Sequence, residues 1–404
     1  MGSQAPLTET LPAPPFNRRE VAGAFGDIGV LFPIAIALIT LNHMNPTAVF
    51  LAAGLAYILA GRYYRIPIAI EPFKAVAAIA LAMSLSPSAI ASAGLLMGIL
   101  LAVIGLTDIA RWLAKVFTLP VVRGIQLGLG LLLVREGLHL LASPGATEIL
   151  GRNFRLPGWG VALAGVAVLL AFQSSRRFPA ALVLLAAGLL AGISVAWGRL
   201  AAFQWGPLPV EWLHPRLSEL WRVIPLLVIP QFALTFGNSI VATENTASIL
   251  YGERARRVTV RALTLSIALI NLVSAAIMGS PMCHGSGGIT AHYRFGARTE
   301  KASYVIGGIC VALALFGRAA IGLLNLIPLA VLAVFLIYVG VRHGAYLRDI
   351  ARRTPWLLIA IVVGVISLLT TNLTWGFLAG FALEGSGRLI SKLRSLHATL
   401  PRSE

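Results

Sequence analysis

Two short interruptions of an otherwise apolar chain constrain its fold more than any other feature. They are IPIAIEPFKAVAAIAL at residues 66–81 and GSPMCHGSGGITAHY at residues 279–293. Each places charged, Pro-rich or Gly-rich backbone inside sequence that is otherwise apolar enough to span a bilayer. Lipid cannot satisfy free backbone N–H and C=O groups, so such backbone must be buried in protein or line a polar cavity. Each interruption therefore predicts a short extended stretch that leads into a half-helix.

The composition is that of an integral membrane protein. Of 404 residues, 58% are hydrophobic and 12% are charged, and the mean hydropathy is +0.85. A soluble protein carries about 25% charged residues. The apolar runs predict an all-α polytopic membrane protein with 14 transmembrane segments, two of them half-spans. The segments are expected at 21–41, 47–61, 71–84, 89–107, 120–136, 158–173, 179–197, 224–245, 258–278, 285–296, 302–317, 320–340, 355–372 and 374–387.

The formal net charge of +17 is spread over alternate connections rather than gathered in a patch, which argues against nucleic acid as a partner. Clusters such as RYYR at 62–65 and ERARR at 253–257 fall on one predicted side, together with both termini. Lys74 and Arg123 lie within segments. By the positive-inside rule we expect both termini in the cytoplasm, which an even number of crossings satisfies. The expected location is a prokaryotic inner membrane.

The order of segments is repeated with an offset of seven. GAFGDIGVLFP in segment one and PQFALTFGNSIVATEN in segment eight share a Phe-Gly pair followed by a polar residue. Segments three and ten are the interrupted ones, and segments five and twelve both open on an aliphatic-Pro step. An odd offset turns the second copy upside down. This is the seven-plus-seven inverted repeat of many secondary transporters.

The inversion predicts two half-helices whose N-termini face each other at mid-depth. Segment three should become helical near Pro72 and segment ten near Gly285. Two opposed N-termini contribute about one positive charge equivalent and several unpaired N–H donors. Gly285 and Gly287 let the backbone approach a ligand closely. The sequence therefore predicts an anion site.

Polar side chains surround this predicted site. Lys74 adds a full charge one turn into the first half-helix, although it could instead snorkel to the cytoplasmic face. Ser286 and His284 add donors in the second half-helix, and His284 could equally be a packed residue. Gln231 and Asn238 are seven apart on one face of segment eight. Their amides could orient an oxyanion or hold helices together.

Carboxylates inside membrane segments are candidates for function because their burial is costly. Glu71 lies beside the predicted anion site, so it is either protonated or paired with Lys74, and both arrangements permit proton coupling. Asp27 could be a proton site or could pair with backbone. Glu244, near the cytoplasmic end of segment eight, could be a proton site, although a half-exposed ion pair is favoured.

The strings GAFGDIGVLFP, IPIAIEPFK, PQFALTFGNSIVATE and PMCHGSGG followed by YRFGART resemble the molybdate transporter family, which is related to the sulfate permeases. The resemblance extends from about residue 20 to residue 390. It implies a core domain that moves against a gate domain, and import of molybdate, a tetrahedral dianion, with protons. The expected units are a mobile cytoplasmic arm (1–20), core segments 1–4 (21–107), gate segments 5–7 (108–197), core segments 8–11 (198–317), gate segments 12–14 (318–390) and a cytoplasmic tail (391–404).

The family's site is carried over by position. The implied substrate-binding residues are Pro72, Lys74, Gln231, Asn238, His284, Gly285, Ser286 and Gly287. The family usually has Gln where this chain has Glu71, so a carboxylate there puts the substrate or the coupling in question.

The expected function is secondary active import of molybdate by alternating access. Sulfate and tungstate stay open, because tetrahedral dianions of similar radius are hard to separate by geometry. A permease for a nucleobase or another organic anion is the alternative, with Phe73 placed to stack on a planar ring, and an anion channel is less favoured. No enzyme, cofactor or metal site is expected, since His284 with Cys283 is too small a constellation. The expected partners are the oxyanion, protons and the lipid bilayer, and a homodimer is left open.

Overall fold

The computed structural model describes residues 17–398 except 108, 110–112, 114–117, 144–147, 150–151, 154–156, 174, 176–179 and 199–202. Most of the predicted arm and the end of the predicted tail therefore lie outside the described residues. The first half contains α1 (Arg18–Ala24), α2 (Ile28–Leu41), α3 (Pro46–Tyr64), β1 (Glu71–Pro72), α4 (Lys74–Ala82), α5 (Pro87–Leu106), α7 (Leu119–Ala142), β2 (Glu148–Ile149), β3 (Arg152–Asn153), α8 (Gly158–Phe172) and α9 (Ala180–Ala196). The second half contains α10 (Leu217–Val223), η3 (Ile224–Val228), α11 (Ile229–Leu234), η4 (Thr235–Val241), α12 (Ala242–Tyr251), η5 (Gly252–Ala255), α13 (Val260–Ala276), β4 (Met282–Cys283), α14 (Ser286–Phe295), α15 (Lys301–Leu315), α16 (Gly317–Leu324), α17 (Leu329–Gly344), η6 (Ala345–Asp349), α18 (Thr354–Thr370) and α19 (Leu373–Ala398).

The described part of the chain is a helical membrane protein. Six helices are long and apolar enough to cross a bilayer, or seven if the bent pair α15 and α16 is one span. Fourteen crossings and the inverted repeat stay predictions. The helix at residues 18–24 starts inside the predicted arm, where Glu20 is buried and accepts hydrogen bonds from the backbone N–H groups of Arg298 and Thr299.

The predicted segment at 320–340 differs from the structure. α16 ends at Leu324, α17 begins at Leu329, and α15 and α16 are bent by 91°. Pro328 immediately precedes the first residue of α17. A proline inside a continuous helix would remove a hydrogen bond and clash with the preceding turn, whereas it is tolerated at a helix start. The predicted segment followed the apolar run across 320–340, although Asn325 and Pro328 interrupt that run.

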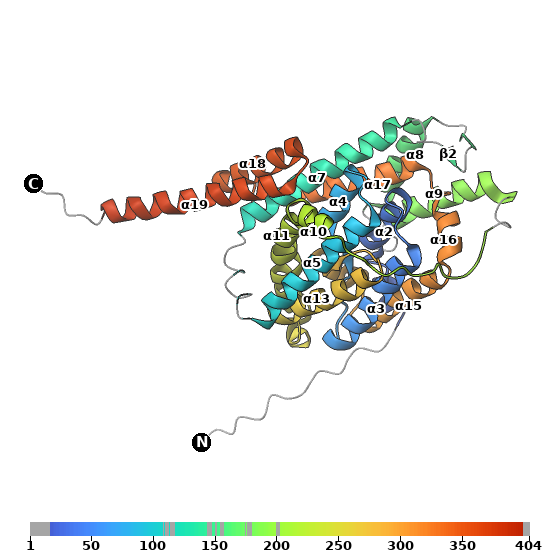
Figure 1. Ribbon diagram of the computed structural model, residues 1–404, viewed down its shortest axis with the longest axis horizontal. Helices are drawn as coiled ribbons and strands as arrows, with labels where there is room; N and C mark the ends of the chain where they lie inside the picture. Colours follow the sequence, from blue (N-terminus) through green and yellow to red (C-terminus); the bar gives the residue numbers. More distant parts are fainter. Residues whose placement is uncertain are drawn as a thin grey trace, which may run out of the picture.

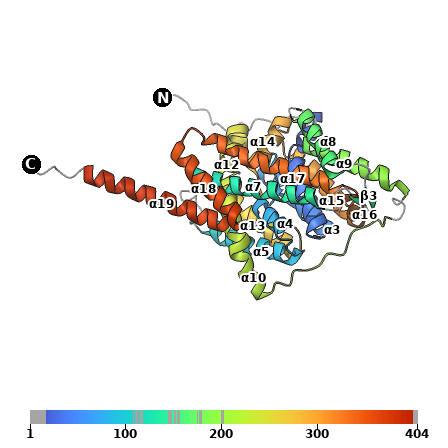
Figure 2. The same cartoon turned by 90° about the horizontal axis from the view of Figure 1, so that it is seen from above.

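Two groups of helices pack around the interruptions. α7 packs along α17 and α18, while α3 packs on α15 and α5 packs on α13. α7 and α17 approach closely at Gly130 and Gly340, where a Cβ on either glycine would overlap the other's carbonyl oxygen. α18 and α19 lie side by side at one end of the molecule, with α8 and α9 at the other, and α19 projects beyond the rest (Figures 1 and 2). The two groups meet where α4 and η4 contact α7.

The stretch of helix at residues 217–255 is continuous and includes two π-helical parts, η3 and η4. π-Helical turns are rare and occur frequently at functional sites. This stretch carries Gln231 on α11 and Asn238 on η4. Both amides of the predicted site therefore come from this one stretch of helix.

Candidate functional site

A pair of extended dipeptides joins the two interruptions. β1 pairs antiparallel with β4, with Glu71 opposite Cys283 and Pro72 opposite Met282. The Phe73 N–H donates to the Pro281 carbonyl oxygen at 2.8 Å. Because the strands run in opposite directions, α4 and α14 leave the pair in opposite directions and their N-termini flank it.

The first half-helix starts later than expected. Pro72 lies in β1 and Phe73, which is 1% exposed, is the N-cap, so α4 begins at Lys74 rather than near Pro72. Lys74 is therefore in the first turn and not one turn further on. The reason is the cross-strand partner: the Phe73 N–H bonds to Pro281, which keeps the backbone at residues 71–73 out of the helix.

Gln231 uses its side chain to cap α4. Its Oε1 accepts hydrogen bonds from the backbone N–H of Ala75 at 2.9 Å and of Val76 at 3.3 Å. Its Nε2 donates to Thr235 Oγ1 at 2.9 Å. The protein itself therefore takes up the N–H groups of Ala75 and Val76, and α4 offers a ligand chiefly the charge of Lys74.

The start of α14 is different. Within the described residues, no acceptor takes the backbone N–H groups of Ser286, Gly287 and Gly288. Gly287 is exposed, whereas Gly285 and Gly288 are buried. The Ser286 hydroxyl donates to Asn238 Oδ1 at 3.1 Å. The two half-helices are thus unequal, because free backbone donors lie at α14, whereas α4 contributes the ammonium group of Lys74.

An acidic cluster lies directly behind these donors. Lys74 Nζ is 2.6 Å from Glu71 Oε2, and the Glu71 side chain is 1% exposed. Asp27 is fully buried; its Oδ2 accepts the hydroxyl hydrogen of Tyr57, and its Oδ1 has no donor among the described residues. A Cβ on Gly288 would overlap both Asp27 Oδ1 and Glu71 Oε1. Two carboxylates and one ammonium group therefore share a largely buried site, in which the Lys74 side chain is 11% exposed.

Two predicted residues have protein partners of their own. His284 Nε2 is 2.7 Å from Ser266 Oγ and its Nδ1 is 3.1 Å from the Ala69 carbonyl oxygen, so both ring nitrogens are occupied. Glu244 Oε1 accepts the Val260 N–H at 2.9 Å at the start of α13. His284 positions the backbone before β1, and Glu244 caps a different helix.

Tyr346, Arg123 and Gln126 are close to the site and were missed as site residues. The Tyr346 hydroxyl would be 3.4 Å from a Cβ on Gly287. The Arg123 Cζ is 5.2 Å from the centre of the Tyr346 ring, and its Nη1 donates to Gln126 Oε1 at 2.8 Å. The signal was available, because a charged residue inside an apolar segment is a functional candidate. Arg123 was predicted to lie within a segment, but not to take part in the site.

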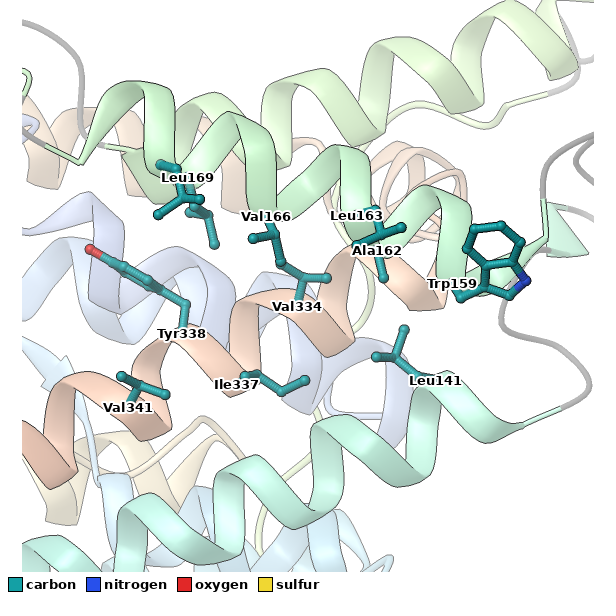
Figure 3. Close-up of a pocket in the computed structure, with 11 residues that line it drawn as sticks. Leu141, Trp159, Ala162, Leu163, Val166, Leu169, Val334, Ile337, Tyr338 and Val341 are labelled. Atoms are coloured by element: carbon teal, nitrogen blue, oxygen red, sulfur yellow. The ribbon is translucent and has the colours of Figure 1, made fainter.

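An apolar groove of about 430 Å³ between α8 and α17 is a poor alternative site. Figure 3 shows Leu163 and Val166 facing Val334 and Ile337, with the Tyr338 hydroxyl and the Trp159 indole nitrogen toward opposite ends. A desolvated anion needs hydrogen-bond donors or a counter-charge. The groove lacks a charged lining residue among those described, so it does not suit an anion.

Comparison with known proteins gives a consistent answer. A family model described as the molybdate transporter of the MFS superfamily matches residues 19–133 and 224–342. Molybdate transporter 2 of Arabidopsis thaliana is 27% identical over 93% of this chain and 88% of its own length. Molybdate transporter 1 of Chlamydomonas reinhardtii is 25% identical over 89% of each chain. These relatives are transporters, and transport is not an enzymatic function.

Two solved structures share the fold. The transmembrane domain of the cyanobacterial bicarbonate transporter BicA has a TM-score of 0.64 at 19% identity, covering 91% of this chain and 98% of that one. The murine Slc26a9 anion transporter in the inward-facing state has a TM-score of 0.66 at 15% identity, covering 93% and 69%. The family match extends over both interruptions and over η4, where Asn238 accepts the hydrogen bond from the Ser286 hydroxyl. The chain therefore belongs to the molybdate transporter family.

Proposed function

We propose that the protein imports molybdate, or a similar tetrahedral oxyanion such as sulfate or tungstate, by secondary active transport. The observation that carries this proposal is the set of unpaired N–H groups at Ser286, Gly287 and Gly288 beside the Lys74 ammonium. Helix N-termini with free donors bind oxyanions, and a nearby lysine adds charge. The oxyanion transport named for the relatives supports the same substrate class.

The proposed substrate site consists of the N-terminus of α14, the Ser286 hydroxyl and Lys74. Asn238 orients Ser286, and Gln231 holds the start of α4 in place. A planar nucleobase would instead need a ring to stack on. Phe73 is buried at the N-cap of α4, which leaves Tyr346 as the aromatic side chain next to Gly287.

Proton coupling is assigned to Asp27. Glu71 already has a positive partner in Lys74, whereas Asp27 Oδ1 has no donor among the described residues. Arrival of a dianion adds negative charge beside both carboxylates and increases the electrostatic repulsion within the site. Uptake of a proton by one of the carboxylates reduces this repulsion. We infer that Asp27 takes it, with the Tyr57 hydroxyl donating to the other oxygen.

The transport cycle is alternating access between the segments predicted as core and gate, in an inner membrane with both termini in the cytoplasm. Gly287 and Thr290 on α14 are exposed, while α4 is buried from Ala75 to Leu81. The predicted direction of α14 runs from mid-depth toward the cytoplasm. This difference in exposure supports an inward-facing arrangement.

The test is binding to the purified full-length protein in detergent. Molybdate, tungstate, sulfate and uracil are titrated calorimetrically between about pH 5 and 8. We expect saturable binding of the oxyanions and none of uracil, together with molybdate uptake into proteoliposomes that saturates and responds to a pH gradient. Uracil binding without oxyanion binding would establish the nucleobase alternative, and flux that never saturates would indicate a channel.

A further inference from the structure

We propose that Arg123 and Gln126 of α7 form a second half of the oxyanion site, and that Asp349 holds the Arg123 guanidinium until the substrate replaces it. The inference rests on the proposed function and adds residues from the helix opposite the two half-helices. Substrate binding is thereby linked to α7 and η6, because Arg123 on α7 exchanges Asp349 on η6 for the substrate.

The first observation is a route of contacts from α14 to α7. Ser286 donates to Asn238, and the adjacent Gly237 packs so tightly on α7 that a Cβ there would overlap the Val122 side chain. Gln126 follows Val122 by one helical turn and lies on the same face. The face of α7 that bears Gln126 is thus turned toward the segment that orients Ser286.

A second set of contacts leads from α7 back to α14. Arg123 donates to Gln126 Oε1 and lies over the Tyr346 ring, whose hydroxyl reaches Gly287. Lys74 also lies close enough to Tyr346 for the two side chains to interact electrostatically. The contacts therefore lead from α14 to α7 and back to α14, and both Lys74 and Arg123 lie near Tyr346.

The second observation is that α7 carries unused donors. Gln126 is fully buried, and its Nε2 has no acceptor among the described residues. The Nε of Arg123 is also buried without a described acceptor. Buried donors are nearly always paired in native proteins, so donors left over at one place call for an acceptor that is absent from the chain itself. An oxyanion supplies acceptors only.

The third observation concerns charge. Glu71 already balances Lys74, so a dianion needs a further cation. Arg123 pairs with Asp349, whose side chain is 50% exposed, whereas that of Arg123 is 17% exposed. Water can solvate Asp349 once it is released, and exposed ion pairs are weak. The guanidinium fork matches a tetrahedral oxyanion, so exchange of Asp349 for substrate is favourable.

The test measures molybdate binding to full-length protein in detergent for Arg123→Gln, Asp349→Asn and the double variant. Arg123→Gln should weaken binding by about tenfold or more, because a charge-assisted contact is lost. Asp349→Asn should tighten binding by several-fold, because the Asp349 carboxylate then no longer competes with the substrate for the Arg123 guanidinium. The double variant should bind as Arg123→Gln does. Arg135→Gln is the matched control, since Arg135 is an exposed arginine on the same helix that bonds to Thr371.

Perrhenate, a tetrahedral anion with one charge, is the charge control. Arg123→Gln should reduce the preference for molybdate over perrhenate, whereas Arg135→Gln should not. Wild-type affinity in Arg123→Gln, or unchanged or weaker binding in Asp349→Asn, overturns the inference. If Arg123→Gln does not fold, Asp349→Asn decides alone. If the wild type binds no oxyanion, the proposed function itself is refuted. This outcome differs from those that overturn only the roles of Arg123 and Asp349.

Discussion

Lys74 Nζ lies 2.6 Å from Glu71 Oε2 at the first turn of α4. The lysine that should attract the substrate is therefore already neutralised before the substrate arrives. Glu71 stands where the family resemblance implies Gln, and a neutral Gln at this position would leave the lysine charge available. An incoming anion has to share the ammonium group with a buried carboxylate.

Glu71→Gln should strengthen molybdate binding at neutral pH by roughly tenfold, because the lysine is then free to make a charge-assisted contact with the anion. Calorimetric titration at pH 7 measures the change. The melting temperature of the ligand-free variant should fall, since the lysine loses its partner, and molybdate should restore it. Weaker binding than in the wild type would mean that Glu71 itself organises the site.

Lys74→Gln should weaken dianion binding by more than tenfold and should also destabilise the protein, since Glu71 is left buried without its counter-charge. The double variant Glu71→Gln/Lys74→Gln separates these effects. It should recover the thermal stability measured in detergent but not the affinity. Recovery of both would show that Lys74 serves only to balance Glu71.

Gly287→Val should fold and lose oxyanion binding. A Cβ on Gly287 meets no atom closer than the Tyr346 hydroxyl at 3.4 Å. Because Cβ atoms tilt toward the N-terminus of a helix, a valine side chain there should narrow the approach to the free N–H groups. Gly285→Val should instead impair folding, because a Cβ there would overlap the Glu71 carboxylate. Gly308→Val on α15, which meets no atom within 4 Å, is the control for adding a β-branched residue to a helix. Full molybdate binding by folded Gly287→Val would remove the site from α14.

Gln231→Leu should lower stability by about 1–3 kcal/mol, because the N–H groups of Ala75 and Val76 lose their acceptor in a buried setting. Chemical denaturation in detergent measures the loss. Gln231→Glu retains an oxygen acceptor, so the first turn of α4 should stay capped and the stability should stay close to that of the wild type. If the two variants were equally stable, the capping role of Gln231 would be refuted.

Asp27→Asn should abolish most of the pH dependence of binding. In the wild type, molybdate binding should draw up to about one proton from solution, and affinity should rise as pH falls. Linkage requires that the slope of log affinity against pH equal the number of protons taken up. Titrations in buffers of different ionisation enthalpy measure the uptake. An unchanged slope in Asp27→Asn would move the proton site to Glu71 or Glu244.

The positions of the two interruptions could be predicted from the sequence, because they follow from local chemistry. Charged, Pro-rich and Gly-rich residues gather at 66–81 and 279–293, where they disfavour a continuous apolar helix, and this pattern predicted the two interruptions. Lys74, Ser286 and Gly287 are close enough in sequence to those interruptions to be assigned to the site without tertiary information.

Which groups remain free for a ligand depended on contacts between distant parts of the chain. Gln231 reaches Ala75 across 156 positions, and His284 reaches Ala69 across 215. Arg123 meets Asp349 across 226 positions. Composition and spacing describe each segment separately, so they identified the polar residues but not their partners. Because a hydrogen bond requires donor and acceptor within about 3 Å, only the packed arrangement of α4, α7, α11 and α14 decided which donors were already used and which were left for an anion.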